Sequence, residues 1–132
     1  MSARRRLVTE DDVGIGVLVC GGRYYENEVK IYRELDKVHK DIGIAVLIHG
    51  TASGADTIAE EWAKRRQIPY FGVPAKWNTH GRSAGPIRNA WMLKEASPDL
   101  IMAFHDDIEN SKGTKDMMDR ADDAGYNVKF YD

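Results

Sequence analysis

Small and polar residues gather in the stretch Ile48–Asp56, whose sequence is IHGTASGAD. An apolar run precedes it, and residues 55–66 have the pattern of a helix. A strand that turns through small residues directly into a helix presents free backbone N–H groups. These groups and the helix dipole favour an anion, most often a phosphate. The stretch therefore predicts a phosphorylated ligand, with Gly50, Thr51 and Gly54 as N–H donors.

Two residues of this stretch, Ser53 and Asp56, permit two interpretations. Their spacing is that of a capping box, with Ser53 as the N-cap and Asp56 at N3. Alternatively, Asp56 orients a ribose hydroxyl of a bound nucleotide. The stretch has neither the lysine of a Walker sequence nor a GxGxxG fingerprint, so nothing in it supports hydrolysis of a nucleoside triphosphate.

An arginine follows a pair of glycines at Gly21-Gly22-Arg23, directly after the apolar run Val17–Cys20. Paired glycines let a backbone approach a ligand closely, or simply turn a corner. Arg23 favours the first interpretation, because a guanidinium at the end of a strand can fork onto a phosphate or carboxylate.

A second arginine lies in the stretch GRSAGPIRN, residues 81–89, where Pro86 is expected to open a helix. Arg88 and Asn89 would then occupy its first turn. A cation there opposes the helix dipole at a cost of about 0.3–1 kcal/mol, so Arg88 indicates an anion in the site. A salt bridge from Arg88 to Asp56 or another carboxylate is the alternative.

Two other predicted loops add candidates. Trp77 could stack on a base or cap the core. Thr114, after Gly113, is an expected N-cap whose hydroxyl or N–H could also reach a phosphate. The ligand-binding candidates are Gly21, Gly22, Arg23, Gly50, Thr51, Ser53, Gly54, Asp56, Trp77, Arg82, Gly85, Arg88, Asn89, Gly113 and Thr114. The four histidines show no metal-ligand spacing, so no metal is predicted.

Strand and helix patterns alternate along the chain and would position these residues. Strands are expected at 17–20, 44–48, 70–73, 100–104 and 128–131. Helices are expected at 26–39, 55–66, 86–96 and from 114 to about 124, with 76–84 as a loop. This alternation predicts an α/β fold, a single-domain, doubly wound, mainly parallel five-stranded Rossmann-like sheet with helices on both faces. The loops after the strands should converge at one edge of the sheet.

Composition limits the function classes. The chain has 132 residues and a formal net charge of −2, so its overall charge gives no reason to expect nucleic acid or membrane binding. No apolar run approaches the roughly 20 residues of a membrane span. One cysteine, Cys20, cannot form an internal disulfide, so a reducing, cytoplasmic setting fits. Residues 1–14 are expected to be a flexible N-terminal arm, with Arg4-Arg5-Arg6, before a domain at 15–132.

Together these blocks resemble the YspA-type, YpsA-related branch of the SLOG superfamily. The resemblance covers residues 17–131 and includes VCGGR at 19–23, HGTASGAD at 49–56, PAKW at 74–77, GRSAGPIRN at 81–89 and KGTKDM at 112–117. It implies a Rossmann-like sheet and a nucleotide-derived ligand at the glycine-rich loops, often in phage or anti-phage settings. More distant relatives are the Lonely Guy phosphoribohydrolases and the DprA proteins, which bind single-stranded DNA. The Lonely Guy motif has a glutamate where this chain has Met117, which weakens a hydrolase assignment.

Three hypotheses follow. The first is binding or sensing of a nucleotide or derivative, such as an ADP-ribose-type ligand, with no further cofactor required. The second is an N-glycoside hydrolase acting on a nucleotide, for which Asp56, Asp107 and Asp116 are weak catalytic candidates. The third is a DprA-like association with nucleic acid, which the acidic domain makes the least favoured. The superfamily resemblance also implies a homodimer or higher homo-oligomer, and no membrane partner is expected.

Overall fold

The computed structural model describes residues 14–132, and five parallel strands form one sheet in this part of the chain. The strands are β1 (Ile15–Gly21), β2 (Ile44–His49), β3 (Tyr70–Gly72), β4 (Leu100–Phe104) and β5 (Val128–Tyr131). Their spatial order is β3-β2-β1-β4-β5, and each neighbouring pair is parallel. The predicted α/β Rossmann-like fold is therefore confirmed. The expected arm at 1–14 lies, except for Gly14, outside the described residues.

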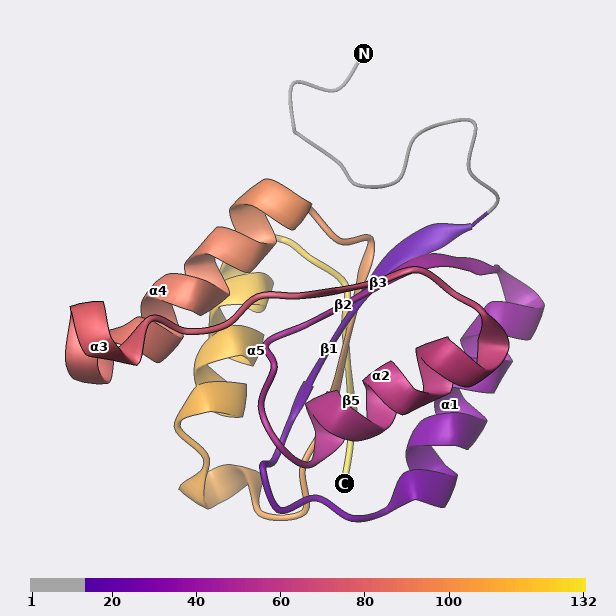
Figure 1. The fold of residues 1–132 in the computed structure, drawn as a ribbon, viewed down its shortest axis with the longest axis horizontal. Coiled ribbons are helices and arrows are strands. Elements are labelled where there is room, and N and C mark those ends of the chain that lie inside the picture. Colours follow the sequence, from indigo (N-terminus) through magenta and orange to yellow (C-terminus); the bar gives the residue numbers. More distant parts are fainter. Residues whose placement is uncertain (1–13) are drawn as a thin grey trace.

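Helices cover both faces of the sheet, as predicted. They are α1 (Glu28–Asp41), α2 (Ala55–Arg66), α3 (Trp77–His80), α4 (Ala84–Trp91) and α5 (Gly113–Asp123). Helices α1 and α2 lie on one side, and α4 and α5 lie on the other (Figure 1). Side chains alternate accordingly, because successive residues of a strand point to opposite faces. Val17 and Val19 join the core with residues of α1 and α2, whereas Leu18 packs with residues of α5 and of the turn Met92–Ala96 that follows α4.

The segment 76–84, expected as a loop, is largely helical. Helix α3 is followed by a 3₁₀ turn, Gly81–Ser83, and α4 begins at Ala84 rather than at Pro86. Proline is tolerated at its observed third position, because the first four N–H groups of a helix have no intrahelical acceptor. The prediction from Pro86 is therefore correct for the first turn of α4 and wrong for its first residue.

Helix α4 continues into a π-helical turn, Met92–Ala96, and ends at Ser97 with φ +46°. A π turn leaves the regular pattern of hydrogen bonds, so its carbonyls need other donors. The hydroxyl of Tyr126 donates to the carbonyl of Leu93 at 2.6 Å and thereby ties this turn to the segment after α5.

The strand order fixes where a ligand can reach the sheet. The chain leaves β1 for α1 on one face, and it leaves β4 for α5 on the other (Figure 1). A crevice therefore opens outside the carboxyl ends of these two neighbouring strands. Within residues 14–132, every helix is too short or too polar to traverse a lipid bilayer.

Candidate functional site

A cleft of about 1380 Å³ occupies the carboxyl edge of the sheet, where the loops after β1, β2, β3 and β4 meet. All but one of the fifteen predicted ligand-binding residues line it, although they come from loops that are far apart in sequence. The weaker candidates Asp107 and Asp116 line it too. The predicted residues are thus brought together; that they bind a ligand stays a prediction.

Gly54 is the exception. It does not line the cleft, but it determines how closely two of the cleft loops approach each other. Its φ of +73° is a conformation that side chains with a Cβ rarely adopt. A Cβ at this position would lie 2.2 Å from the carbonyl oxygen of Gly22. Gly54 therefore allows the β2–α2 loop to pack directly on the loop after β1.

Asp56 does not complete a capping box with Ser53. The N-cap of α2 is Gly54, without a side-chain cap, and the hydroxyl of Ser53 instead donates to the carbonyl of Arg23 at 3.0 Å. The capping interpretation is wrong because it considered only contacts between Ser53 and its own helix, whereas Ser53 bonds to another loop. Ser53 fastens two loops together.

The carboxylate of Asp56 stabilises the loop that precedes its helix. Its Oδ2 accepts the N–H of Gly50 at 2.9 Å and that of Ala52 at 3.2 Å. The N–H of Thr51 donates to Nδ1 of His49 at 3.0 Å. The expectation that Gly50 and Thr51 offer free N–H groups to the cleft is therefore wrong. This loop contributes shape rather than those two donors.

Asp56 is also the buried ionisable group of the cleft, with 5% of its surface exposed. Burial raises the pKa of its carboxyl to about 6, and the N–H groups of Ala52 and Gly50 and the charges of His49 and Arg88 oppose this rise. The same burial raises the pKa of the Cys20 thiol on the neighbouring strand, and the charge of Asp56 adds to it. A thiol held protonated is a poor nucleophile.

Arg88 is fixed by carbonyl groups rather than by a carboxylate. Its Nη1 donates to the carbonyl of Gly50 at 2.6 Å and to that of Val73 at 3.4 Å, and its Nε donates to Oδ1 of Asn89 at 2.9 Å. Burial lowers the pKa of Arg88, and the charge of Asp56 opposes this. A Cβ on Gly50 would lie 2.5 Å from Nη1, so a side chain there would displace the Arg88 guanidinium.

Contrary to the prediction, Arg88 does not lie in the first turn of its helix. Because α4 begins at Ala84, Arg88 is its fifth residue and lies beyond the first turn, where the dipole is weak. A direct salt bridge to Asp56 is not formed either. A partly buried guanidinium at the cleft nevertheless keeps a positive charge on its floor.

The rim of the cleft carries cations without partners. In residues 14–132, the guanidinium groups of Arg23 and Arg82 and the amino group of Lys112 make no hydrogen bond or ion pair. The indole of Trp77, which also lines the cleft, is 55% exposed and lies against Gly85. The rim can therefore bind an anion and an aromatic ring without breaking existing contacts.

Thr114 is not the N-cap of α5. The helix begins one residue earlier, at Gly113, and the N–H of Thr114 donates to Oγ of Ser111 at 3.1 Å. Ser111 is thus a cleft residue that the sequence pattern did not single out. A serine three residues before the start of a helix-like pattern would have been the signal.

His105 is a second residue that was left out of the predicted site. Its Nδ1 accepts the N–H of Asp107 at 2.9 Å, and its ring lies 3.2 Å from the position of a Cβ on Gly22. Because Nδ1 is an acceptor, the neutral ring carries its proton on Nε2 and can donate it in the cleft. Its place directly after β4 was the available signal.

Asp116 and Asp107 both have hydrogen-bond donors. Oδ2 of Asp116 accepts from Nδ2 of Asn89 at 3.0 Å and from Nε of Arg120 at 2.9 Å. Asp107 accepts from the amide of Asn110 at 3.1 Å. Between residues 14 and 132, no group of three or more His, Cys, Asp or Glu side chains is arranged to hold a metal.

The comparisons with known proteins agree with this architecture. Residues 15–80 match the family described as the YspA, cpYpsA-related SLOG family. The chain is also 35% identical over 118 residues to the Gene 61 protein of Mycobacterium phage D29, an alignment that covers 85% of this chain and 92% of the relative. No solved structure matches the chain. A Rossmann-like protein with a cleft at the topological switch point is thus defined. The chain belongs to the YspA, cpYpsA-related SLOG family.

Proposed function

We propose that the cleft binds a nucleotide or a nucleotide derivative such as an ADP-ribose-type ligand. The observation that carries the proposal is the rim, where Arg23 and Arg82 have no partners among residues 14–132 and the Trp77 ring is exposed. Guanidinium groups fork onto phosphate, and an indole stacks on a base. Membership of the SLOG family supports a nucleotide-related function.

The size of the cleft favours a ligand larger than a mononucleotide. Small-molecule pockets commonly enclose about 300–1,000 Å³, and the volume of this cleft is about 1380 Å³. Gly21 and Gly22 have no side chains at the end of β1, so a sugar–phosphate chain can lie close to the backbone.

Phosphorylated ligands should stabilise the protein. At a concentration 100-fold above the dissociation constant, ADP-ribose should add about 2.7 kcal/mol and raise the Tm by about 10 °C. Adenosine, which lacks phosphate, should raise it far less. Thermal unfolding with ADP-ribose, ADP, AMP and adenosine measures this. Arg82→Ala should lower the affinity at least tenfold, since hydrogen bonds to charged groups contribute about 1.5–3 kcal/mol.

Arg33→Ala is the matched control for Arg82→Ala, because Arg33 is an exposed arginine of α1 that does not line the cleft. It should bind like the wild type. If no phosphorylated compound of the panel changes the Tm, the nucleotide proposal fails. If adenosine stabilises as much as ADP-ribose, the role given to the arginines fails.

A second candidate is hydrolysis of an N-glycosidic bond of a nucleotide. It is favoured by Asp56, a cleft carboxyl with a pKa of about 6, since such a group can give or take a proton near neutral pH. Chromatography of nucleoside monophosphates after incubation tests it. Base release that disappears in Asp56→Asn would support the hydrolase; no release above the level of that variant would eliminate it.

Several expectations stay predictions. A homodimer would need an apolar surface, and the stacked rings of Phe71 and Trp91, both partly exposed, offer one between β3 and α4. Arg4-Arg5-Arg6, the basis of a nucleic-acid role, lies outside the described residues. Cytoplasmic location and independence of any further cofactor are likewise untested.

A further inference from the structure

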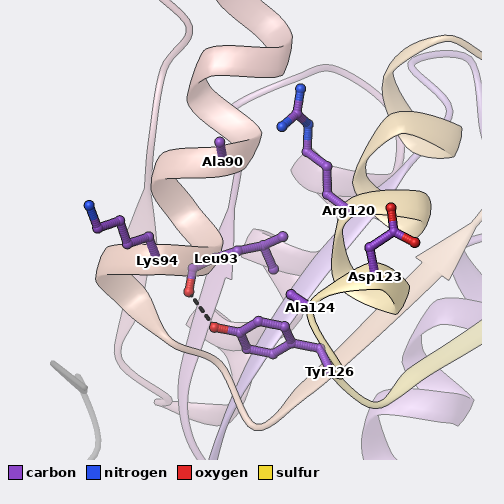
Figure 2. A pocket seen from close by; sticks show the side chains of 7 residues that line it. All are labelled: Ala90, Leu93, Lys94, Arg120, Asp123, Ala124 and Tyr126. Atoms are coloured by element: carbon purple, nitrogen blue, oxygen red, sulfur yellow. Dashed lines mark hydrogen bonds between the residues drawn. The ribbon is translucent and has the colours of Figure 1, made fainter. Parts of the chain in front are cut away.

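A second cavity, of about 450 Å³, lies between the end of α4 with its π turn and the end of α5 (Figure 2). It shares no residue with the cleft. Its lining includes Ala90, Leu93, Lys94, Arg120, Ala124 and Tyr126. We call it the α4–α5 hollow. Neither the proposed function nor the family comparison assigns it a role.

The floor of the hollow is apolar and fixed. Leu93 is only 5% exposed, and the Tyr126 ring is held by the 2.6 Å hydrogen bond from its hydroxyl to the Leu93 carbonyl. The facing helices contribute the small side chains of Ala90 and Ala124, which leave the hollow open (Figure 2). A flat ring or short alkyl group could cover this floor and remove apolar surface from water.

The rim of the hollow carries the cations of Lys94 and Arg120 and the carboxylate of Asp123, and Arg120 is also paired with Asp116 at 2.9 Å. The amino group of Lys94 has no partner in the part of the chain that the structure describes. Among the described residues, Arg120 bonds only through its Nε, which donates to Asp116, so its two terminal nitrogens keep their N–H groups for another acceptor. A carboxylate accepts two parallel hydrogen bonds from such nitrogens.

We propose that the α4–α5 hollow binds a small amphipathic monoanion, namely a carboxylate on an aromatic ring or a short alkyl chain. The carboxylate is bound by the terminal nitrogens of Arg120, and the apolar body covers Leu93 and Ala124. The carboxylate complements these free N–H groups and the body complements the floor. This site stands independently of the nucleotide proposal, because the two cavities have no residue in common.

A chain of hydrogen bonds connects the hollow to the cleft. Arg120 and Asn89 donate to the same oxygen, Oδ2 of Asp116, and Asn89 accepts from Arg88. An anion on the terminal nitrogens of Arg120 shares the guanidinium with Asp116, weakens the bond from Nε to Asp116, and so alters the bond between Asp116 and Asn89. Binding in the hollow therefore changes the hydrogen bonding of the Asn89 side-chain amide, which lines the cleft.

Benzoate is the probe that tests the site, and neutral benzamide, of the same shape, is its control. In ¹H–¹⁵N NMR spectra, benzoate should shift the backbone amides of Ala90, Leu93 and Ala124 saturably, with a Kd on the order of 1 mM. Benzamide at the same concentrations should leave them unchanged. The Asn89 side-chain amide should shift along with them if the hydrogen-bonded chain transmits the binding.

Two variants separate binding from folding. Arg120→Gln should weaken the affinity for benzoate at least tenfold. Ala124→Leu, which fills the hollow and keeps the cations, should abolish the shifts. Arg33→Gln is the control and should bind benzoate like the wild type. Absent shifts, shifts confined to cleft residues, or equal shifts with benzamide would overturn the site. An unmoved Asn89 amide at saturation would overturn the link to the cleft. A failed nucleotide panel would leave these outcomes unaffected.

Discussion

Gly54→Ala should destabilise the protein by about 3 kcal/mol or more. Two costs combine. The residue has a φ of +73° and a ψ of −124°, a conformation that alanine adopts only under strain. Its Cβ would also lie 2.2 Å from the Gly22 carbonyl oxygen, so the two loops would have to separate. Urea unfolding followed by circular dichroism measures the loss.

Two other glycines separate these costs. Gly81 has a φ of +57° but no atom within 4 Å of its Cβ position, so Gly81→Ala should lose only about 1–2 kcal/mol from backbone strain. Gly113 is free of both problems and lies in α5, so Gly113→Ala should be neutral or gain up to about 1 kcal/mol. A loss in Gly54→Ala no greater than in Gly81→Ala would contradict the close contact of the two loops.

The second large effect is a loss of stability as Asp56 ionises. Because its folded pKa is raised from 3.8 to about 6, the folded protein holds this proton more tightly than the unfolded chain. The resulting stabilisation, about 3 kcal/mol, is fully present below pH 4 and disappears as the pH rises through 6. The free energy of unfolding of the wild type minus that of Asp56→Asn should therefore fall by about this amount between pH 4 and pH 7.

Subtraction of the variant is necessary because other carboxylates act in the opposite direction. The hydrogen bond from Arg66 lowers the pKa of Asp36, so the stabilisation from Asp36 is lost as the pH falls. Asp36→Asn is accordingly the control, and its difference curve should have the opposite slope. A flat difference curve for Asp56→Asn would show that water reaches this carboxylate.

Local patterns predicted the fold well. Helix α2 has the predicted bounds, Ala55–Arg66, and the apolar runs mark all five strands. Both depend on periodicity, which the sequence displays directly. The convergence of the loops also followed from topology, since parallel strands with helical crossovers bring every strand-to-helix loop to one edge.

What could not be predicted were contacts between segments distant in sequence. Ser53 bonds to Arg23, and the Arg88 guanidinium reaches the carbonyl of Gly50. The local rules assigned Ser53 to its own helix and Arg88 to the dipole of α4, because spacing alone shows only neighbours. The predicted cap Thr114 failed for a related reason. The N-cap position of α5 is Lys112, and Ser111 accepts the N–H of Thr114 because of the course of the chain before the helix.

The central position of β1 governs when the cleft can come into existence. Val17 pairs on one side with Leu47 and on the other with Leu100. As the chain emerges from a ribosome, β1, β2 and β3 can associate early with α1 and α2, whereas the β1–β4 pairing must wait until most of the chain has been synthesised. Closing so long a loop is slow and entropically costly. Until then, the face of the half-built sheet that α5 covers in the finished protein stays exposed, and the cleft at the carboxyl edge is incomplete.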